Sequence, residues 1–524
     1  MEASIVPLVA ETKTENNSIW QQKDIAAGKC LYGFFEFQYG LDKRSNEPFC
    51  NLTGASKLNI LRFVGESGYR KRYLEGSNNY ILILERDNKI EPVTIDLIRI
   101  AVFNNLLKHR EVTITYKKSW KFKADLLQTI YLKNQDQIFN KNFLELLPEC
   151  TTPELKDTKE TAYFPFQNGI ISVTKDGFSF IDYPDLQNLN MCVWLSHILQ
   201  REYRHTDVLQ PGEFEKFINN ISNHEESRIR AFKSALGYLQ HNHNGSHMGY
   251  AVFFYDQKPT DSKNPQGGTG KGVITQSLSY QRETPRIDGK HFKSDDRFRF
   301  QAVNATSQIV IIDDLAKEVG LEPFFSALTD GFTIEKKHQD SIKLTPENSP
   351  KMAFSMNTVI NGNGSSHRRR MFVVELSDYY SSKIKTGVEH PVEDEHGILF
   401  DRFKWTNTDW NTFTRYMLEC VQFYLKYDLQ PYELINVSQN LLIQTTGEDF
   451  ANWATEKDFK LGFRYNTKDF FEEYSGRYYG GDPSFRQRTF TNLLGKYADS
   501  KGLKRKIETN NSSKTSQFFF ISNS

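Results

Sequence analysis

A glycine-rich stretch at residues 264–272, NPQGGTGKG, narrows the folds open to this chain, because it stands between a strand signal and a helix signal. The apolar run Tyr250–Tyr255 precedes it and predicts a buried strand, whereas Val273–Leu278 follows it and predicts a helix. Glycines let successive backbone N–H groups point at one anion, and a helix N-terminus adds partial positive charge. The order strand, glycine loop, lysine and helix therefore predicts a phosphate-binding loop in an α/β fold.

The loop is expected to bind ATP, with the Lys271 ammonium facing the β- and γ-phosphates. The predicted ATP-binding residues are Gly267, Gly268, Thr269, Gly270, Lys271 and Gly272. Two positions depart from the usual pattern: Pro265 replaces its first glycine, and Gly272 replaces the serine or threonine that binds Mg²⁺. Water or Thr275 are the candidates to replace that hydroxyl. Taken alone, the stretch also fits a glycine-rich turn between a strand and a helix.

A second apolar run, Gln308–Ile312, ends in the pair Asp313 and Asp314. A continuous apolar run predicts a central strand covered on both faces, and its carboxyl end is expected beside the phosphate loop. We expect Asp313 to hold Mg²⁺ through water, and Asp314 to orient and deprotonate the attacking water. The alternative is a strand that ends in an Asx turn.

Two further segments carry candidate catalytic residues. The run Lys351–Met356 predicts another buried strand, and Asn357 at its end is expected near the γ-phosphate, although such a residue also caps turns. Three arginines, of which Arg369 and Arg370 are the candidates, precede the strand signal Met371–Leu376. In a ring of ATPases an arginine of this kind reaches the neighbouring subunit's γ-phosphate and stabilises transition-state charge.

Between the aspartate strand and the asparagine strand lies a predicted hairpin with arms at Thr333–Glu335 and Ile342–Leu344. Lys336, Lys337 and His338 fall near its tip. A basic tip is suited to DNA phosphates, so these three residues are predicted DNA contacts. Lysine near a strand edge also protects against aggregation, which is the alternative reading.

The order of these motifs resembles that of superfamily 3 helicases. It runs from the glycine loop through the aspartate pair, the basic hairpin and the asparagine strand to the arginine strand. Superfamily 3 helicases are hexameric AAA+ motors of small DNA viruses, phages, plasmids and poxvirus-type primase-helicases. The hairpin Ile334–His338 is similar to the DNA-gripping hairpin of polyomavirus members, which implies that Lys337 and His338 line a central channel. Residues 370–376 look like the arginine-finger strand of parvovirus members, which makes Arg370 the first choice and Arg369 the second. The resemblance spans residues 250–378 and implies an AAA+ core with a parallel sheet and helices.

The rest of the chain divides by composition into further segments. The expected domains are a flexible N-terminus at 1–28, an α+β domain of unclear role at 29–150, a strand pair with a helical subdomain at 151–245, the AAA+ core at 246–385, a helical lid and linker at 386–448, and a module at 449–524. The N-terminal domain contains a strand signal at Tyr80–Leu84, a helix signal at Ile95–Leu107 and a basic-aromatic run at Gly68–Tyr73. That run is better explained by a solvated turn than by single-stranded nucleic acid.

The last segment predicts a winged-helix-like module. A helix signal near Thr467–Tyr474 is followed by a basic one at Ser484–Ser500, and then by a hairpin that ends in Gln517–Ile521. The second helix is the candidate for a DNA groove. The predicted DNA contacts here are Arg486, Arg488, Lys504 and Arg505. Binding of a protein partner by the same module is the equally weighted alternative.

The composition of the chain limits the classes of protein to which it can belong. The chain has 524 residues and a formal net charge of +1, so DNA binding must depend on local patches. Its five cysteines form no C-x-x-C pair, which argues against a zinc ribbon and favours a reducing compartment such as the cytoplasm of a bacterial host. No apolar run approaches the ~20 residues of a membrane span, and no signal-peptide core stands at the N-terminus.

The sequence therefore predicts an ATP-dependent, ring-forming DNA helicase for the replication of a phage, virus or mobile element, with ATP and Mg²⁺ as cofactors. Its expected partners are DNA and further copies of itself in a homohexamer, with a primase or polymerase as additional candidates and no membrane. One alternative is a primase-helicase, although Asp87, Glu91 and Asp96 form no metal site with a histidine. The other is an ATP-dependent protein that assembles on an origin or partner and unwinds little DNA.

Overall fold

The computed structural model describes residues 22–26, 29–32, 35–75, 79–107, 113–116, 120–123, 125–205, 210–245, 249–257, 268–316, 319–337, 341–356, 369–397, 403–434, 442–443, 445–510 and 515–522. The chain forms two compact units, one of residues 1–155 with 182–198 and one of residues 156–181 with 199–524. Among the described helices, none combines the length and the apolar character needed to cross a membrane.

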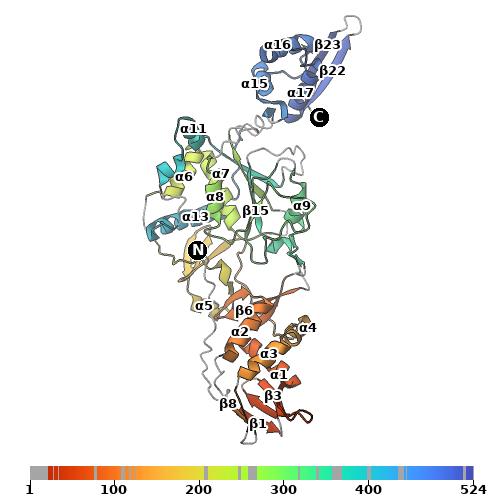
Figure 1. The fold of residues 1–524 in the computed structure, drawn as a ribbon. Helices are drawn as coiled ribbons and strands as arrows, with labels where there is room; N and C mark the ends of the chain where they lie inside the picture. Colours follow the sequence, from red (N-terminus) through yellow and green to blue (C-terminus); the bar gives the residue numbers. More distant parts are fainter. Residues whose placement is uncertain are drawn as a thin grey trace. The chain divides into compact units, whose positions relative to one another are not determined.

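The second unit is built on a parallel sheet of five described strands in the order β15–β16–β19–β14–β20 (Figure 1). Their bounds are β14 (Ala251–Asp256), β15 (Arg286–Asp288), β16 (Ile309–Asp313), β19 (Lys351–Met356) and β20 (Met371–Leu376). The predicted parallel α/β sheet is thus confirmed. The aspartate strand β16 does not pair with the loop strand β14, because β19 lies between them and separates them by about 10 Å.

Alternate residues of these strands enter two different apolar cores, as the two-residue period of a strand requires. Val252 and Phe254 pack on one face with α6 (Glu213–Ile221), α7 (Glu226–Gln240) and α13 (Asn407–Tyr427). On the other face, Phe253 and Tyr255 pack with α9 (Glu322–Thr329). Figure 1 shows α7 and α8 (Lys271–Leu278) on one side of the sheet and α9 on the other. Both faces are covered, which explains the uninterrupted apolar runs in the sequence.

The strand pair predicted after residue 151 is present. A third strand, which the sequence did not predict, pairs with it. The strands β10 (Thr161–Phe166), β11 (Gly169–Thr174) and β12 (Gly177–Ile181) make an antiparallel sheet. A buried arginine, Arg282, ties this sheet to the core by donating to the Asp157 carboxylate at 2.9 Å, to the Tyr163 carbonyl at 2.9 Å and to the Gln240 carbonyl at 2.7 Å. Its charge is therefore paired, as burial demands.

The helical segments that follow β20 also pack on the core. They are α11 (Tyr379–Lys385), α12 (Pro391–His396) and α13. The segment expected as a helical lid and linker, 386–448, contains α13, which begins at a capping box. Thr406 accepts from the Asp409 N–H while Asp409 accepts from the Thr406 N–H. Its buried face contacts α7, so the helix expected as a lid is part of the core packing.

The C-terminal module has its own aromatic core, which contains the buried side chains Trp453, Tyr474 and Phe490. Its elements are α15 (Glu448–Lys457), β21 (Tyr465–Asn466), α16 (Thr467–Tyr479), α17 (Gln487–Ser500), β22 (Leu503–Asn510) and β23 (Thr515–Ser522). The strands pair in the order β21–β23–β22. Both predicted helices and the terminal hairpin are confirmed.

The first unit contains both helices and strands. Its described strands form sheets with the orders β1–β2–β3–β4, β13–β7–β6–β5 and β8–β9. The bounds are β1 (Gln22–Ala26), β2 (Lys29–Tyr32), β3 (Phe35–Leu41), β4 (Pro48–Leu52), α1 (Gly54–Glu66), β5 (Tyr69–Tyr73), β6 (Tyr80–Arg86), β7 (Lys89–Pro92), α2 (Ile95–Leu107), β8 (Thr113–Tyr116), β9 (Trp120–Lys123), α3 (Asp125–Ile138), α4 (Lys141–Leu144), α5 (Tyr183–Asn188) and β13 (Val193–Trp194). The predicted strand β6 and helix α2 are confirmed, whereas residues 69–73 form a strand rather than a turn.

A close contact between α7 and α13 generates a stability prediction. A Cβ atom on Gly237 of α7 would lie 2.0 Å from the Cys420 carbonyl oxygen of α13. Gly237→Ala should therefore lower the free energy of unfolding by about 2 kcal/mol or more through overpacking, as measured by urea unfolding. Gly476→Ala is the matched control in α16, where no atom lies within 4 Å, and should instead stabilise by up to about 1 kcal/mol. Equal effects of the two substitutions would contradict the close approach.

Candidate functional site

The described part of the glycine loop brings Lys271 to the carboxyl end of β14. Gly270 adopts a left-handed conformation with φ of +102° and caps α8, which Lys271 opens. The Lys271 ammonium is buried, bonds to the Asp256 carboxylate and lies 3.3 Å from Thr269 Oγ1. The loop lysine thus lies at the carboxyl end of β14. It is held there by Asp256, a residue that the sequence analysis did not name. Gly267 lies outside the described residues.

Two glycines of the loop are required by both conformation and space. Gly268 has φ of +96°, and a Cβ there would lie 2.4 Å from Ile384 Cδ1 of α11. A Cβ on Gly270 would lie 2.6 Å from Cζ of Phe217 in α6. Side chains of two helices therefore enclose the loop backbone, and a larger residue at either glycine would push the loop away from them.

The position that usually carries the magnesium-binding hydroxyl has no side chain. Around Gly272, a Cβ would meet no atom within 4 Å, so the space is open. The proposed replacement, Thr275, donates its hydroxyl to the Gly272 carbonyl at 3.2 Å and accepts from Arg286 at 3.2 Å. Its oxygen is thus engaged by neighbours within α8 and β15.

Asp313 and Asp314 follow β16 at the carboxyl edge of the sheet. The Ser355 hydroxyl of β19 donates to Asp313 Oδ1, and the Asp314 N–H donates to the Ser355 carbonyl at 3.0 Å. Asp314 adopts φ of +53°, which turns the chain sharply after the strand. Ser355 therefore fixes both acidic residues from the strand that stands between them and β14. The serine was visible as the one hydroxyl within the apolar run Lys351–Met356.

Two cations that the sequence analysis did not single out face this acidic pair. Arg286 of β15 lies 3.5 Å from Asp313 Oδ2, and Lys290 lies 3.1 Å from Asp314 Oδ2. Burial lowers the pKa of Arg286, and the Asp313 charge opposes that shift. The Asp314 carboxylate raises the pKa of Lys290. One cation of β15 and one of the following loop thus face the two aspartates.

The oxygen donors at this edge suit Mg²⁺. Nucleotide-bound Mg²⁺ is usually held by one or two carboxylates together with phosphates and waters. Asp313 and Asp314 supply such carboxylates at the same edge as the loop lysine. These residues fit the metal that the sequence predicts.

The candidate arginines lie at the opposite end of the strands, which is their amino end. Arg370 immediately precedes β20, and its carbonyl accepts from the Ala251 N–H at the start of β14, at 2.8 Å. Its guanidinium lies 4.7 Å from the centre of the Phe325 ring. Because β14 is six residues long, roughly 17 Å separate this end from the loop end. Arg369 lies beside Arg370, whereas Asn357 falls outside the described residues.

The basic hairpin forms between β17 (Thr333–Ile334) and β18 (Ile342–Lys343). Lys337 is exposed, Lys336 is partly buried, and Glu335 pairs with Arg297 at 2.6 Å. His338 lies outside the described residues. The hairpin base joins the core where the Phe332 N–H donates to Ser349 Oγ, at 3.1 Å.

The predicted DNA contacts of the C-terminal module differ in exposure. Arg486, Arg488 and Lys504 are exposed. Arg505 is partly buried and donates to the Thr491 carbonyl of α17, and burial lowers its pKa. Its guanidinium therefore links the hairpin to α17 within the module.

The basic-aromatic strand β5 of the first unit directs its cations inward. Lys71 donates to the Glu145 carbonyl at 2.8 Å, Arg72 donates to the Thr152 carbonyl at 2.8 Å, and Arg70 bonds to the Gly65 carbonyl. These contacts favour a structural role over nucleic-acid binding.

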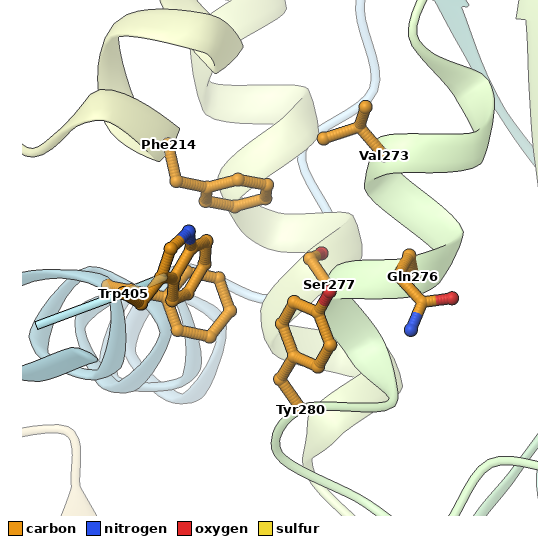
Figure 2. Close-up of a pocket in the computed structure, with 7 residues that line it drawn as sticks. Phe214, Val273, Gln276, Ser277, Tyr280 and Trp405 are labelled. Atoms are coloured by element: carbon orange, nitrogen blue, oxygen red, sulfur yellow. The ribbon is translucent and has the colours of Figure 1, made fainter. Parts of the chain in front are cut away.

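A small aromatic pocket lies beside α8. Figure 2 shows Phe214, Trp405 and Tyr280 around it, with Val273, Gln276 and Ser277 on the helix. Its volume of about 20 Å³ holds about one water. The pocket is therefore a packing void and far too small for a nucleotide base.

Comparison with known proteins gives distant likenesses. No protein-family model matches the sequence, and no curated protein sequence matches it. The A-form apo structure of the NrS-1 C-terminal region has a TM-score of 0.39 and 10% identity, covering 88% of this chain and 99% of that chain. Another structure of that region has a TM-score of 0.30 and 12% identity, covering 69% of this chain and 96% of that chain. Values this low assign neither a family nor a function.

The buried ion pair of Lys271 and Asp256 predicts different stabilities for a single and a double variant. Their side chains are 10% and 4% exposed, so Lys271→Met would leave the Asp256 charge buried without the ammonium. We expect this variant to lose about 3 kcal/mol of unfolding free energy in urea. The double variant Lys271→Met, Asp256→Asn should recover most of that loss. A double variant as unstable as the single one would show that the pair contributes no charge coupling.

Proposed function

We propose that this chain is an ATP-driven, ring-forming DNA helicase that acts in the replication of a phage, virus or mobile element. The proposal rests on one observation: the candidate catalytic residues lie at the two opposite ends of the strands of one parallel sheet. Lys271, Asp313 and Asp314 lie at the carboxyl edge, whereas Arg370 lies at the amino edge. A complete ATP site then requires two copies of the chain, with each copy supplying one edge.

At the carboxyl edge, the triphosphate binds against the N-terminus of α8. The N–H groups of Gly268 and Gly270 bind the phosphates, with Gly267 as a further predicted contact, and Lys271 exchanges Asp256 for the β- and γ-phosphates. Asp313 would hold Mg²⁺, which would supply positive charge against the phosphates. Asp314 orients the attacking water and accepts its proton.

The arginine edge completes the site of the next subunit. About 17 Å of strand separates Arg370 from its own loop, so it cannot reach the γ-phosphate bound in the same chain. Arg370, with Arg369 as the second choice, stabilises transition-state charge across the interface. Asn357 senses the γ-phosphate from the end of β19.

Hydrolysis is coupled to DNA through the basic hairpin. The exposed Lys337, with Lys336 and His338, contacts the phosphates of one strand in the channel of the ring. Successive hydrolysis moves the hairpins and draws that strand through the channel. The order helix, strand, helix, helix and hairpin in residues 448–522 supports a winged-helix module that binds duplex DNA through Arg486, Arg488 and Lys504, with Arg505 behind them.

One observation favours a second function. Gly272 offers Mg²⁺ no hydroxyl, and Thr275 is engaged elsewhere, so turnover is expected to be slow. An ATP-dependent assembly protein that binds an origin or a partner needs ATP binding more than rapid hydrolysis. Hydrolysis that is stimulated by single-stranded DNA supports the motor, whereas ATP-dependent assembly without such stimulation supports the second function.

The phosphate loop is tested by Lys271→Ala. This variant should lose at least a hundredfold of ATP hydrolysis, because the cation that faces the β- and γ-phosphates is gone. Urea unfolding in parallel identifies the folded fraction, to which the rate is normalised. Near-normal hydrolysis by folded Lys271→Ala would refute the assigned nucleotide site.

The hairpin is tested by Lys337→Ala, with Lys343→Ala in the other arm as the matched control. Both lysines are exposed, but only Lys337 adjoins the predicted tip. Lys337→Ala should keep basal ATP hydrolysis and lose unwinding of a forked duplex, whereas Lys343→Ala should keep both. Unwinding at the normal rate in Lys337→Ala would exclude the hairpin as the DNA grip.

A further inference from the structure

The segment of β15 and its following loop is fixed tightly against the acidic pair. Gly289 donates its N–H to the Asp313 carbonyl at 2.6 Å, and the Ala316 N–H donates to the Gly289 carbonyl at 3.3 Å. A Cβ on Gly289 would lie 2.5 Å from Leu315 Cα, so only glycine allows this approach. The backbone contact sets where the side chains on either side of Gly289 lie.

Those side chains place one cation on each aspartate. Arg286 lies 3.5 Å from Asp313 Oδ2 and Lys290 lies 3.1 Å from Asp314 Oδ2. Arg286 also donates to Thr275 Oγ1 at 3.2 Å and to Gln276 Oε1 at 3.3 Å, both in α8. The guanidinium thus links the metal-facing aspartate to the helix that follows the phosphate loop.

Both oxygens of Asp313 have partners in this arrangement. Ser355 donates to Oδ1 and Arg286 contacts Oδ2. A hydroxyl at position 272 would give Mg²⁺ an independent ligand, but Gly272 provides none and the Thr275 hydroxyl faces Arg286. A cation that binds Oδ2 would share that oxygen with the Arg286 guanidinium, and the two positive charges repel each other.

We propose that Arg286 is a positioning residue that competes with Mg²⁺ for Asp313 and thereby makes nucleotide binding depend on magnesium concentration. This inference rests on the proposed ATP site. Bound Mg²⁺ would weaken the contact of Arg286 with Oδ2, whereas without Mg²⁺ the guanidinium keeps its contacts with Asp313, Thr275 and Gln276.

The attraction between Arg286 and Asp313 limits how strongly Arg286 competes with Mg²⁺. The side chains of Arg286 and Asp313 are 33% and 44% exposed, so water and salt screen their attraction. Replacing Arg286 by the uncharged Gln should lower the Mg²⁺ concentration for half-maximal nucleotide binding by about two- to fivefold. Arg286→Lys, which keeps the charge on a shorter reach, should shift it in the same direction by less.

The experiment is a magnesium titration of the full chain with a fluorescent, non-hydrolysable ATP analogue, read by anisotropy. Arg464→Gln is the matched control, because Arg464 forms a similar exposed pair with Glu508 at 2.9 Å far along the sequence in the C-terminal module. It should leave the magnesium midpoint unchanged. If Arg286→Gln fails to fold, Arg286→Lys carries the same test.

The outcomes separate the two proposals. A wild-type chain that binds no analogue at any magnesium concentration would overturn the proposed ATP site itself. Wild-type binding with a midpoint that is unchanged or higher in Arg286→Gln and Arg286→Lys would overturn the competition alone. A lower midpoint in both variants, with Arg464→Gln at the wild-type value, supports it.

Discussion

The buried contact between the Lys271 ammonium and the Asp256 carboxylate holds the described end of the glycine loop to the sheet. Asp256 is the last residue of β14, and Lys271 is the first of α8, so one ion pair closes the connection between them. The same contact keeps the ammonium at the carboxyl edge, where the acidic pair also lies. In the site that we propose, a triphosphate would replace the Asp256 carboxylate as the partner of this ammonium. The same charge would then serve both the fold and nucleotide binding.

The surrounding architecture explains how this edge keeps its geometry. The strands are apolar on both faces and lie between two cores, so their ends are held in register. Gly237 lets α7 and α13 approach closely on one face, and Arg282 connects the end of α8 with the sheet of β10–β12.

Sequence patterns predicted the sheet, the loop and the aspartate pair because apolar runs and glycines report on local backbone structure. They did not reveal that β19 separates β14 from β16, since strand order depends on packing between distant segments. Arg286 and Lys290 were missed for the same reason: their partner aspartates lie more than twenty residues away, and the short β15 has no apolar run. The strand Tyr69–Tyr73 was predicted as a turn because its charged residues concealed the inward hydrogen bonds.

The separation of Arg370 from the glycine loop by the full length of β14 has a consequence for how the chain behaves when it is dilute. In the ATP site that we propose, a solitary molecule holds the two halves at opposite ends of one strand. The activity per molecule is then expected to rise with protein concentration and to fall on dilution. The length of β14 alone would impose this concentration dependence.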